Sequence, residues 1–152
     1  MIELEDLQLD SLSDIDVSFF RARSRRGAPG SILIARYAGN YRFASAGNRD
    51  ARFMYAYGEA AIAAWSPSAV VIDLQNLHYK WGDMLERVFD VGARSYVDSK
   101  FPRALVVGPH CEEPIRTLVL GEYSKKSISS IEWIFRDFEK ALDYVDALLP
   151  TL

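Results

Sequence analysis

The fold of this chain is decided by residues 70–77, which read Val70-Val71-Ile72-Asp73-Leu74-Gln75-Asn76-Leu77. An apolar run rich in β-branched residues is typical of a parallel strand that is buried on both faces. The run ends at Gly82-Asp83, and Asp83-Met84-Leu85-Glu86 has the pattern of a helix start. A strand that leads into a capped helix is half of a βαβ unit, so this stretch predicts an α/β fold with a parallel sheet.

The segment before this strand predicts a hairpin followed by a helix. Apolar residues alternate with polar ones over residues 15–19, and in the apolar run 32–35 Ile32 and Ile34 lie on one side and Leu33 and Ala35 on the other, whereas residues 21–30 carry four arginines with glycine and proline. This pattern indicates two strands joined by a long exposed loop. A second loop is expected over residues 39–49, and Asn48 or Asp50 could cap the helix that Pro67 ends. The apolar face predicted for that helix consists of Phe53, Tyr57, Ala60, Ala61 and Ala64.

The second half of the chain repeats the alternation of strands and helices. Residues 104–108 and 133–135 read as short strands, and a helix beginning near Pro114 should stop at Gly121. Two further apolar stripes predict helices: Leu85, Val88, Phe89, Gly92 and Tyr96 through Ser99, and Phe138, Ala141, Leu142, Val145, Leu148 and Leu149. The order β-β-α-β-α-β-α-β-α predicts a mixed five-stranded sheet covered by four helices. We expect a single domain over residues 15–152, preceded by an N-terminal arm, residues 1–14.

Composition limits the classes of function. The chain has 152 residues, of which 49% are hydrophobic and 26% charged, as expected of one globular domain. A net charge of -3 provides no overall attraction to nucleic acid or acidic lipid. Cys111 is the single cysteine and cannot form an internal disulfide. The acidic start of the chain does not resemble a signal peptide, and no apolar run is long enough to span a membrane. We therefore expect a cytoplasmic protein with no membrane insertion and no nucleic-acid partner.

Three segments resemble a known family. They are Val71-Ile72-Asp73-Leu74, Leu105-Val106-Val107-Gly108-Pro109 and Phe138-Glu139-Lys140-Ala141-Leu142, taken together with the order of elements. In these features residues 31–149 are similar to a STAS domain, the fold of anti-sigma-factor antagonists and of the cytoplasmic tails of anion transporters. The resemblance implies a STAS-like mixed sheet and a function in binding other proteins.

The phosphorylated serine of that family does not carry over to this chain. The family motif at the start of the middle helix is Asp-Ser-Ser-Gly or Asp-Ser-Thr-Gly, and Lys80-Trp81-Gly82-Asp83 stand in its place. No serine or threonine occurs between Leu77 and Ser95. We therefore expect no phosphorylation at this helix start.

The ends of the predicted strands collect the residues that could carry chemistry. His78 and His110 each follow a buried strand, and Cys111, Glu112 and Asp83 should lie at the same edge of the sheet. Imidazole and thiolate could bind a metal, or Cys111 could act as a nucleophile. The spacings typical of such sites, C-x-x-C or H-E-x-x-H, are absent. The sequence favours loop histidines and a part-buried thiol, so no catalytic, metal or cofactor residue is predicted.

Charged and aromatic side chains offer a surface for protein binding instead. The arginines at positions 21, 23, 25 and 26 could bind an acidic protein surface or a phosphate; alternatively they form a solvated loop balanced by the acidic N-terminal arm. Tyrosine and tryptophan in loops often anchor partner proteins. The residues predicted to contact a partner are Tyr41, Phe43, His78, Tyr79, Lys80, Trp81, Asp83, His110, Glu112, Arg23, Arg25 and Arg26.

The sequence thus predicts a non-catalytic regulator of STAS-like fold that sequesters or inhibits a partner protein without a cofactor, and that could also pair with a second copy. Two alternatives stay open. The first is an immunity protein that neutralises a cognate toxin, for which an acidic surface would speed association with a basic partner. The second is a small-molecule-binding or enzymatic domain at the same strand ends.

Overall fold

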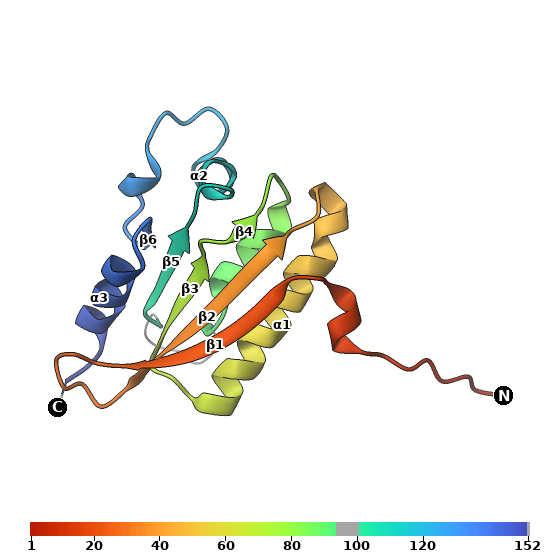
Figure 1. The fold of residues 1–152 in the computed structure, drawn as a ribbon, viewed down its shortest axis with the longest axis horizontal. Helices are drawn as coiled ribbons and strands as arrows, with labels where there is room; N and C mark the ends of the chain where they lie inside the picture. Colours follow the sequence, from red (N-terminus) through yellow and green to blue (C-terminus); the bar gives the residue numbers. More distant parts are fainter. Residues whose placement is uncertain (94–100, 152) are drawn as a thin grey trace.

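The computed structural model describes residues 1–93 and 101–151, and it confirms the predicted α/β architecture. Strand β1 (Asp16–Arg23) is antiparallel to β2 (Ser31–Asn40), and the remaining strands are parallel to β2. They are β3 (Ala69–Leu74), β5 (Arg103–Val107) and β6 (Ile134–Phe135), in the sheet order β1-β2-β3-β5-β6. The described residues contain one strand more than predicted, because Leu77 and His78 leave β3 and pair with the end of β2 as β4 (Leu77–His78) (Figure 1).

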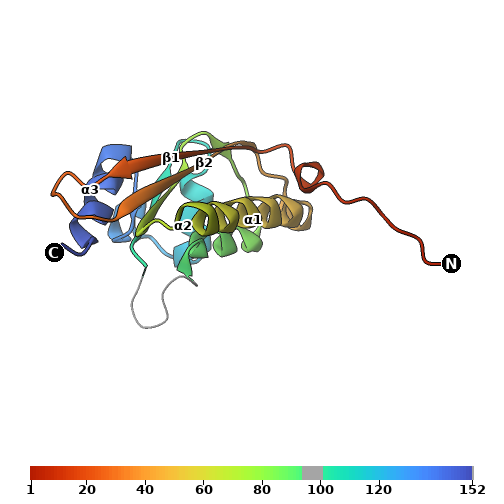
Figure 2. The ribbon, with the colours of Figure 1, turned by 90° about the horizontal axis from the view of Figure 1, so that it is seen from below.

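Helices cover both faces of this sheet. One face carries α1 (Asn48–Trp65), the 3-10 helix η3 (Asp83–Asp90) and α2 (Glu112–Leu120), and Figure 2 shows α1 lying beneath β1 and β2. The opposite face carries α3 (Phe138–Leu148), whose Ala141 and Val145 pack on β2, β3 and β5. Because β3 is covered on both sides, all six of its residues are buried, as the apolar run predicts.

The buried face of α1 differs from the predicted one. Ala60 and Ala64 are exposed, whereas Met54, Gly58 and Ile62 face the sheet. A Cβ atom on Gly58 would lie 2.7 Å from Val91 Cγ2 and 2.8 Å from the Tyr37 hydroxyl oxygen. Helix α1 therefore packs closely against Val91 and Tyr37 at Gly58, and this contact places the face that contains Gly58 toward the core.

The ends of three helices also differ from prediction. Gly47 occupies the N-cap position of α1, so neither Asn48 nor Asp50 caps it. The middle helix is a 3-10 helix that ends at Asp90, and Gly92 follows with φ +87, in the left-handed region. Tyr96 and Ser99, predicted on its stripe, lie outside the described residues. At the carboxyl end, Leu148 is exposed while Leu149 is buried just after α3.

The chain before β1 contains the 3-10 helix η1 (Leu9–Leu12), and residues 1–8 extend away from the body of the protein (Figures 1 and 2). In the described part of the chain, no helix is long and apolar enough to span a membrane. The described residues also include two smaller 3-10 helices, η2 (Ala44–Gly47) before α1 and η5 (Ile128–Ser130) before β6.

Candidate functional site

The carboxyl ends of the strands form one continuous surface. The Tyr41 N–H donates to the His78 carbonyl at 2.9 Å, and the Tyr79 N–H donates to the His110 carbonyl at 3.1 Å. These bonds place residues 40–43, 78–83 and 110–113 side by side, and we call this set the strand-end surface. Segments up to about seventy residues apart in sequence meet here because parallel strands end at the same edge of a sheet.

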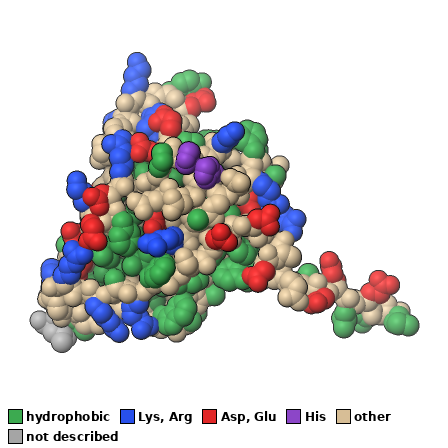
Figure 3. Space-filling view, in the orientation of Figure 1, with side chains coloured by type: hydrophobic (Ala, Val, Ile, Leu, Met, Phe, Trp, Pro, Cys, Tyr) green, Lys and Arg blue, Asp and Glu red, His purple; other side chains and the backbone are tan. Residues whose placement is uncertain are grey.

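His78 and His110 stack against each other on this surface. Their ring centroids are 4.1 Å apart and their planes differ by 10°, and both side chains are exposed, as the adjoining purple side chains of Figure 3 show. Imidazole binds a metal through a lone pair in the plane of its ring, so two parallel rings cannot direct their lone pairs at one ion. Among the described residues, no group of three or more His, Cys, Asp or Glu side chains is arranged to hold a metal.

Tyr41 and Tyr79, predicted to contact a partner, belong instead to the core. They are 5% and 1% exposed, their rings meet edge to face at 5.1 Å, and burial raises the pKa of both hydroxyls. The Tyr79 hydroxyl donates to the Gly82 carbonyl at 2.9 Å, while the Tyr41 hydroxyl has no hydrogen-bond partner among the described residues. The backbone at Gly82 passes over the Tyr41 ring, where an added Cβ atom would lie 3.0 Å from Cε1.

Phe43 and Trp81 present the exposed aromatic side chains of the strand-end surface. Phe43 is 64% exposed and Trp81 is 40% exposed. The Ala44 N–H donates to the Trp81 carbonyl at 3.0 Å, which ties the two loops together through backbone atoms. Lys80 and Asp83 are exposed beside them. The surface therefore offers two apolar rings and both signs of charge on loops that rest on the buried tyrosine pair.

Asp50 anchors the loop that carries Phe43. Its fully buried carboxylate accepts the Ser13 hydroxyl at 2.5 Å, the Arg42 N–H at 2.8 Å and the Arg42 guanidinium at 3.0 and 3.1 Å. Burial by itself would raise the pKa of Asp50, but the hydrogen bonds from Arg42 and Ser13 outweigh it and the net pKa is lowered. The sequence suggested a helix cap at this position, and only the tertiary structure shows the carboxylate joining the chain before β1 to the loop after β2.

An open groove of about 480 Å³ adjoins the strand-end surface where β3 and β5 end. Gln75, Asn76 and Gly108 line it, together with Glu112 and Arg136. The Arg136 guanidinium holds the Glu112 carboxylate through two hydrogen bonds of 2.7 and 2.9 Å, so Glu112 is already paired. Arg136 was missed in the sequence, although it directly follows β6 and the strand-end rule that selected His78 also points to it.

Cys111 lies beneath this groove and is fully buried rather than part-buried as predicted. Its Sγ atom is 3.3 Å from the Leu74 carbonyl oxygen, and burial raises the thiol pKa to about 11. We therefore expect folded protein at neutral pH to resist iodoacetamide and urea-unfolded protein to be alkylated quickly, as measured by intact mass. Rapid alkylation of the folded protein would contradict the inert thiol.

The arginine-rich hairpin lies at the other end of the sheet, apart from the strand-end surface. Arg25 forms ion pairs with Glu139 at 2.6 Å and with Asp143 at 3.2 Å, and Arg26 donates to the Leu149 carbonyl at 2.9 Å. These contacts fasten the hairpin loop to α3. The expectation that the acidic N-terminal arm balances these arginines is wrong for Arg25 and Arg26, because the balancing carboxylates are on α3. Arg23, the last residue of β1, is exposed at the hairpin and also lies apart from the strand-end surface.

One solved structure clarifies the fold. A crystal structure of an anti-sigma factor antagonist from Mycobacterium paratuberculosis matches this chain with a TM-score of 0.54, covering 86% of this chain and 94% of the other. The two sequences are 17% identical over this match, so the likeness shows a shared fold, and it confirms the resemblance to STAS domains. No protein-family model matches the chain, and no curated protein matches it in sequence.

Proposed function

We propose that this chain is a non-catalytic regulator that binds a partner protein through the strand-end surface. The observation that carries the proposal is the pair of exposed aromatic side chains, Phe43 and Trp81, on loops held by backbone hydrogen bonds. Aromatic side chains that are already positioned lose little conformational entropy on binding, and such residues dominate the affinity of protein interfaces. His78, Lys80 and His110 would surround them as a polar rim.

A catalytic role receives less support from the same residues. The thiol of Cys111 is buried and its pKa is raised, which opposes nucleophilic chemistry. Among the described residues, no carboxylate hydrogen-bonds to the ring of His78 or His110, so neither ring is oriented as a general base. The Glu112 carboxylate is occupied by Arg136. These features support a surface that contacts another protein without transforming it.

Trp81→Ala tests the proposal. Trp81 contributes its backbone carbonyl, and not its side chain, to the hydrogen bond with Ala44, so truncating the side chain should change stability by less than about 1 kcal/mol. The same change should weaken partner binding by about 2 kcal/mol, or roughly thirtyfold. Partners captured from a native lysate on immobilised protein would be purified, and their affinity measured by titration calorimetry alongside thermal unfolding of each variant.

Leu148→Ala provides the matched control, because Leu148 is 51% exposed on α3 at the opposite end of the sheet. Binding should survive this change. A large loss of stability in Trp81→Ala with unchanged affinity would overturn the proposal. The purified partner also separates the two predicted classes: a regulatory kinase or sigma-factor system identifies a STAS-type regulator, whereas a toxin inhibited by this chain identifies an immunity protein.

A further inference from the structure

The outer part of the N-terminal arm, residues 1–8, carries apolar side chains that nothing in the described chain covers. Ile2, Leu4 and Leu7 are 88%, 93% and 80% exposed. Ile2 and Leu4 alternate with Glu3 and Glu5, so residues 2–5 have the pattern of an extended strand with one apolar and one acidic face. Such a segment is suited to adding a strand to a sheet edge.

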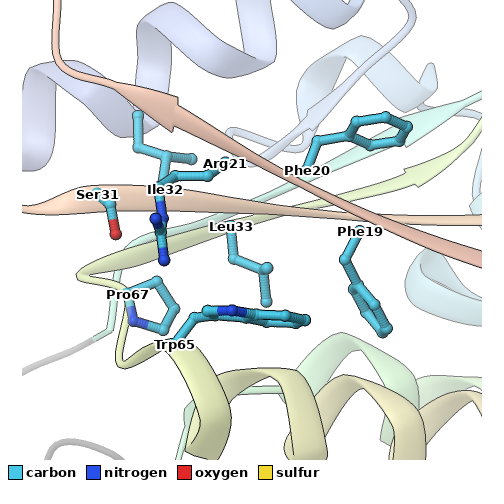
Figure 4. Close-up of a pocket in the computed structure, with 8 residues that line it drawn as sticks. All are labelled: Phe19, Phe20, Arg21, Ser31, Ile32, Leu33, Trp65 and Pro67. Carbon is cyan, nitrogen blue, oxygen red and sulfur yellow. The ribbon is translucent and has the colours of Figure 1, made fainter.

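The edge strand of the sheet, β1, offers a matching acceptor for the arm. β1 pairs with β2 alone among the described strands, so its outer edge is unpaired. Beside it, an apolar pocket of about 230 Å³ opens between the hairpin and the end of α1. Figure 4 shows Phe19, Leu33, Trp65 and Pro67 on the helix side of the strands, with Phe20 on the other side. Arg21 also lines the pocket, and it has no ion-pair partner within the described ranges.

The spacing of the arm matches that of β1 when the two run parallel. In an extended arm, Ile2, Leu4 and Asp6 share one face, and along β1 the helix-side face carries Val17, Phe19 and Arg21. A parallel register that sets Leu4 beside Phe19 also sets Asp6 beside Arg21 and Ile2 beside Val17. An antiparallel register with the same Leu4 contact would place Ile2 beside Arg21 and Asp6 beside Val17, where neither pair is complementary.

We propose that the arm of one copy docks along β1 of a second copy, so that two chains exchange arms in a symmetric dimer. The contacts that hold η1, at the base of the arm, explain why the acceptor is a second copy. Within η1, the Asp10 carboxylate accepts the Tyr57 hydroxyl, the Ser11 carbonyl accepts the Arg49 guanidinium at 3.2 Å, and the Leu12 carbonyl accepts the Arg42 guanidinium at 2.8 Å.

This anchoring leaves an arm too short to reach its own pocket in the parallel register. Tyr57 lies eight residues before Trp65 on α1, about 12 Å along the helix axis. The four residues from Asp6 to Asp10 span about 13 Å at full stretch, which leaves no length for the reversal of direction that self-docking needs. The arm of a second copy does not have to return to a Tyr57 contact on the chain whose pocket it fills, and each copy donates one arm and accepts one.

A cysteine pair tests the contact directly. In Asp6→Cys/Arg21→Cys, mild oxidation should give a disulfide-linked dimer on a non-reducing gel, while buried Cys111 stays unreacted. Each single variant, Asp6→Cys or Arg21→Cys alone, serves as the control and should give far less of the linked dimer. A disulfide within one chain, or no linkage beyond that of the single variants, would overturn the proposal.

Sedimentation velocity of the full chain provides the second readout. The unaltered protein should shift from monomer to dimer as its concentration rises through the micromolar range. Leu4→Ser should weaken the dimer at least about tenfold, whereas Leu7→Ser, the same change on the opposite face of the arm, should weaken it much less. Asp6→Arg or Arg21→Asp should each weaken the dimer, and the two changes combined in one chain should restore it. A monomer at all concentrations, or equal effects of Leu4→Ser and Leu7→Ser, would contradict arm exchange.

Discussion

Asp50→Ala should destabilise the protein by about 3 kcal/mol in urea unfolding, because it removes the acceptor of four hydrogen bonds at a fully buried carboxylate. The Ser13 hydroxyl and the Arg42 backbone N–H would lose their partner, and the loop before Phe43 would lose its anchor. Asp16→Ala is the matched control, since Asp16 is exposed on the edge strand and should cost little. Equal losses of stability in the two variants would refute this role for Asp50.

The same carboxylate should make stability depend on acid. Its pKa in the folded protein is lower than the ordinary value of 3.8, so folding favours the charged form. The stability that this charge contributes is fully present above the ordinary pKa and is lost as the pH falls through the lower pKa of the folded state. In Asp50→Asn, which keeps the shape but carries no charge, the decline of unfolding free energy below about pH 4 should be shallower than in the unaltered protein.

Gly108→Ala should cost about 3 kcal/mol, because it forces a methyl group into backbone atoms. An added Cβ atom would lie 1.9 Å from the Gln75 carbonyl oxygen and 2.7 Å from its carbonyl carbon. No side-chain movement can relieve a clash with backbone, so the ends of β3 and β5 must separate. The measurement is chemical unfolding of Gly108→Ala beside Pro109→Ala, an exposed position in the same loop that should tolerate the change.

Separation of the ends of β3 and β5 can also be detected through the reactivity of Cys111. The Gly108 carbonyl accepts the Cys111 N–H at 3.2 Å and the Glu112 N–H at 3.0 Å, so a displaced Gly108 loosens the start of α2. Cys111 should then react faster with iodoacetamide in Gly108→Ala than in the unaltered protein, even under conditions where both are folded. Unchanged stability and unchanged alkylation together would show that the loop absorbs the methyl group without opening.

Only part of the candidate site could be predicted from the sequence. The meeting of His78 and His110 follows from topology, since parallel strands end at one edge, and the structure places the two rings in contact. The direction of each loop side chain does not follow from any such rule. Phe43 and Trp81 point outward while Tyr41 and Tyr79 point inward, although all four are aromatic residues in the same two segments.

What the sequence by itself determined is the order of the main strands and helices, without β4, and the burial of β3, because period-two alternation and continuous apolar runs are local properties of the chain. Tertiary structure alone decided the rest. The backbone at Gly82 passes over the Tyr41 ring, α3 supplies the carboxylates for Arg25, and Asp50 joins Ser13 to Arg42. Each of these contacts joins the loops or ends of separate elements, where no periodic pattern constrains a side chain and its direction depends on which distant backbone comes close.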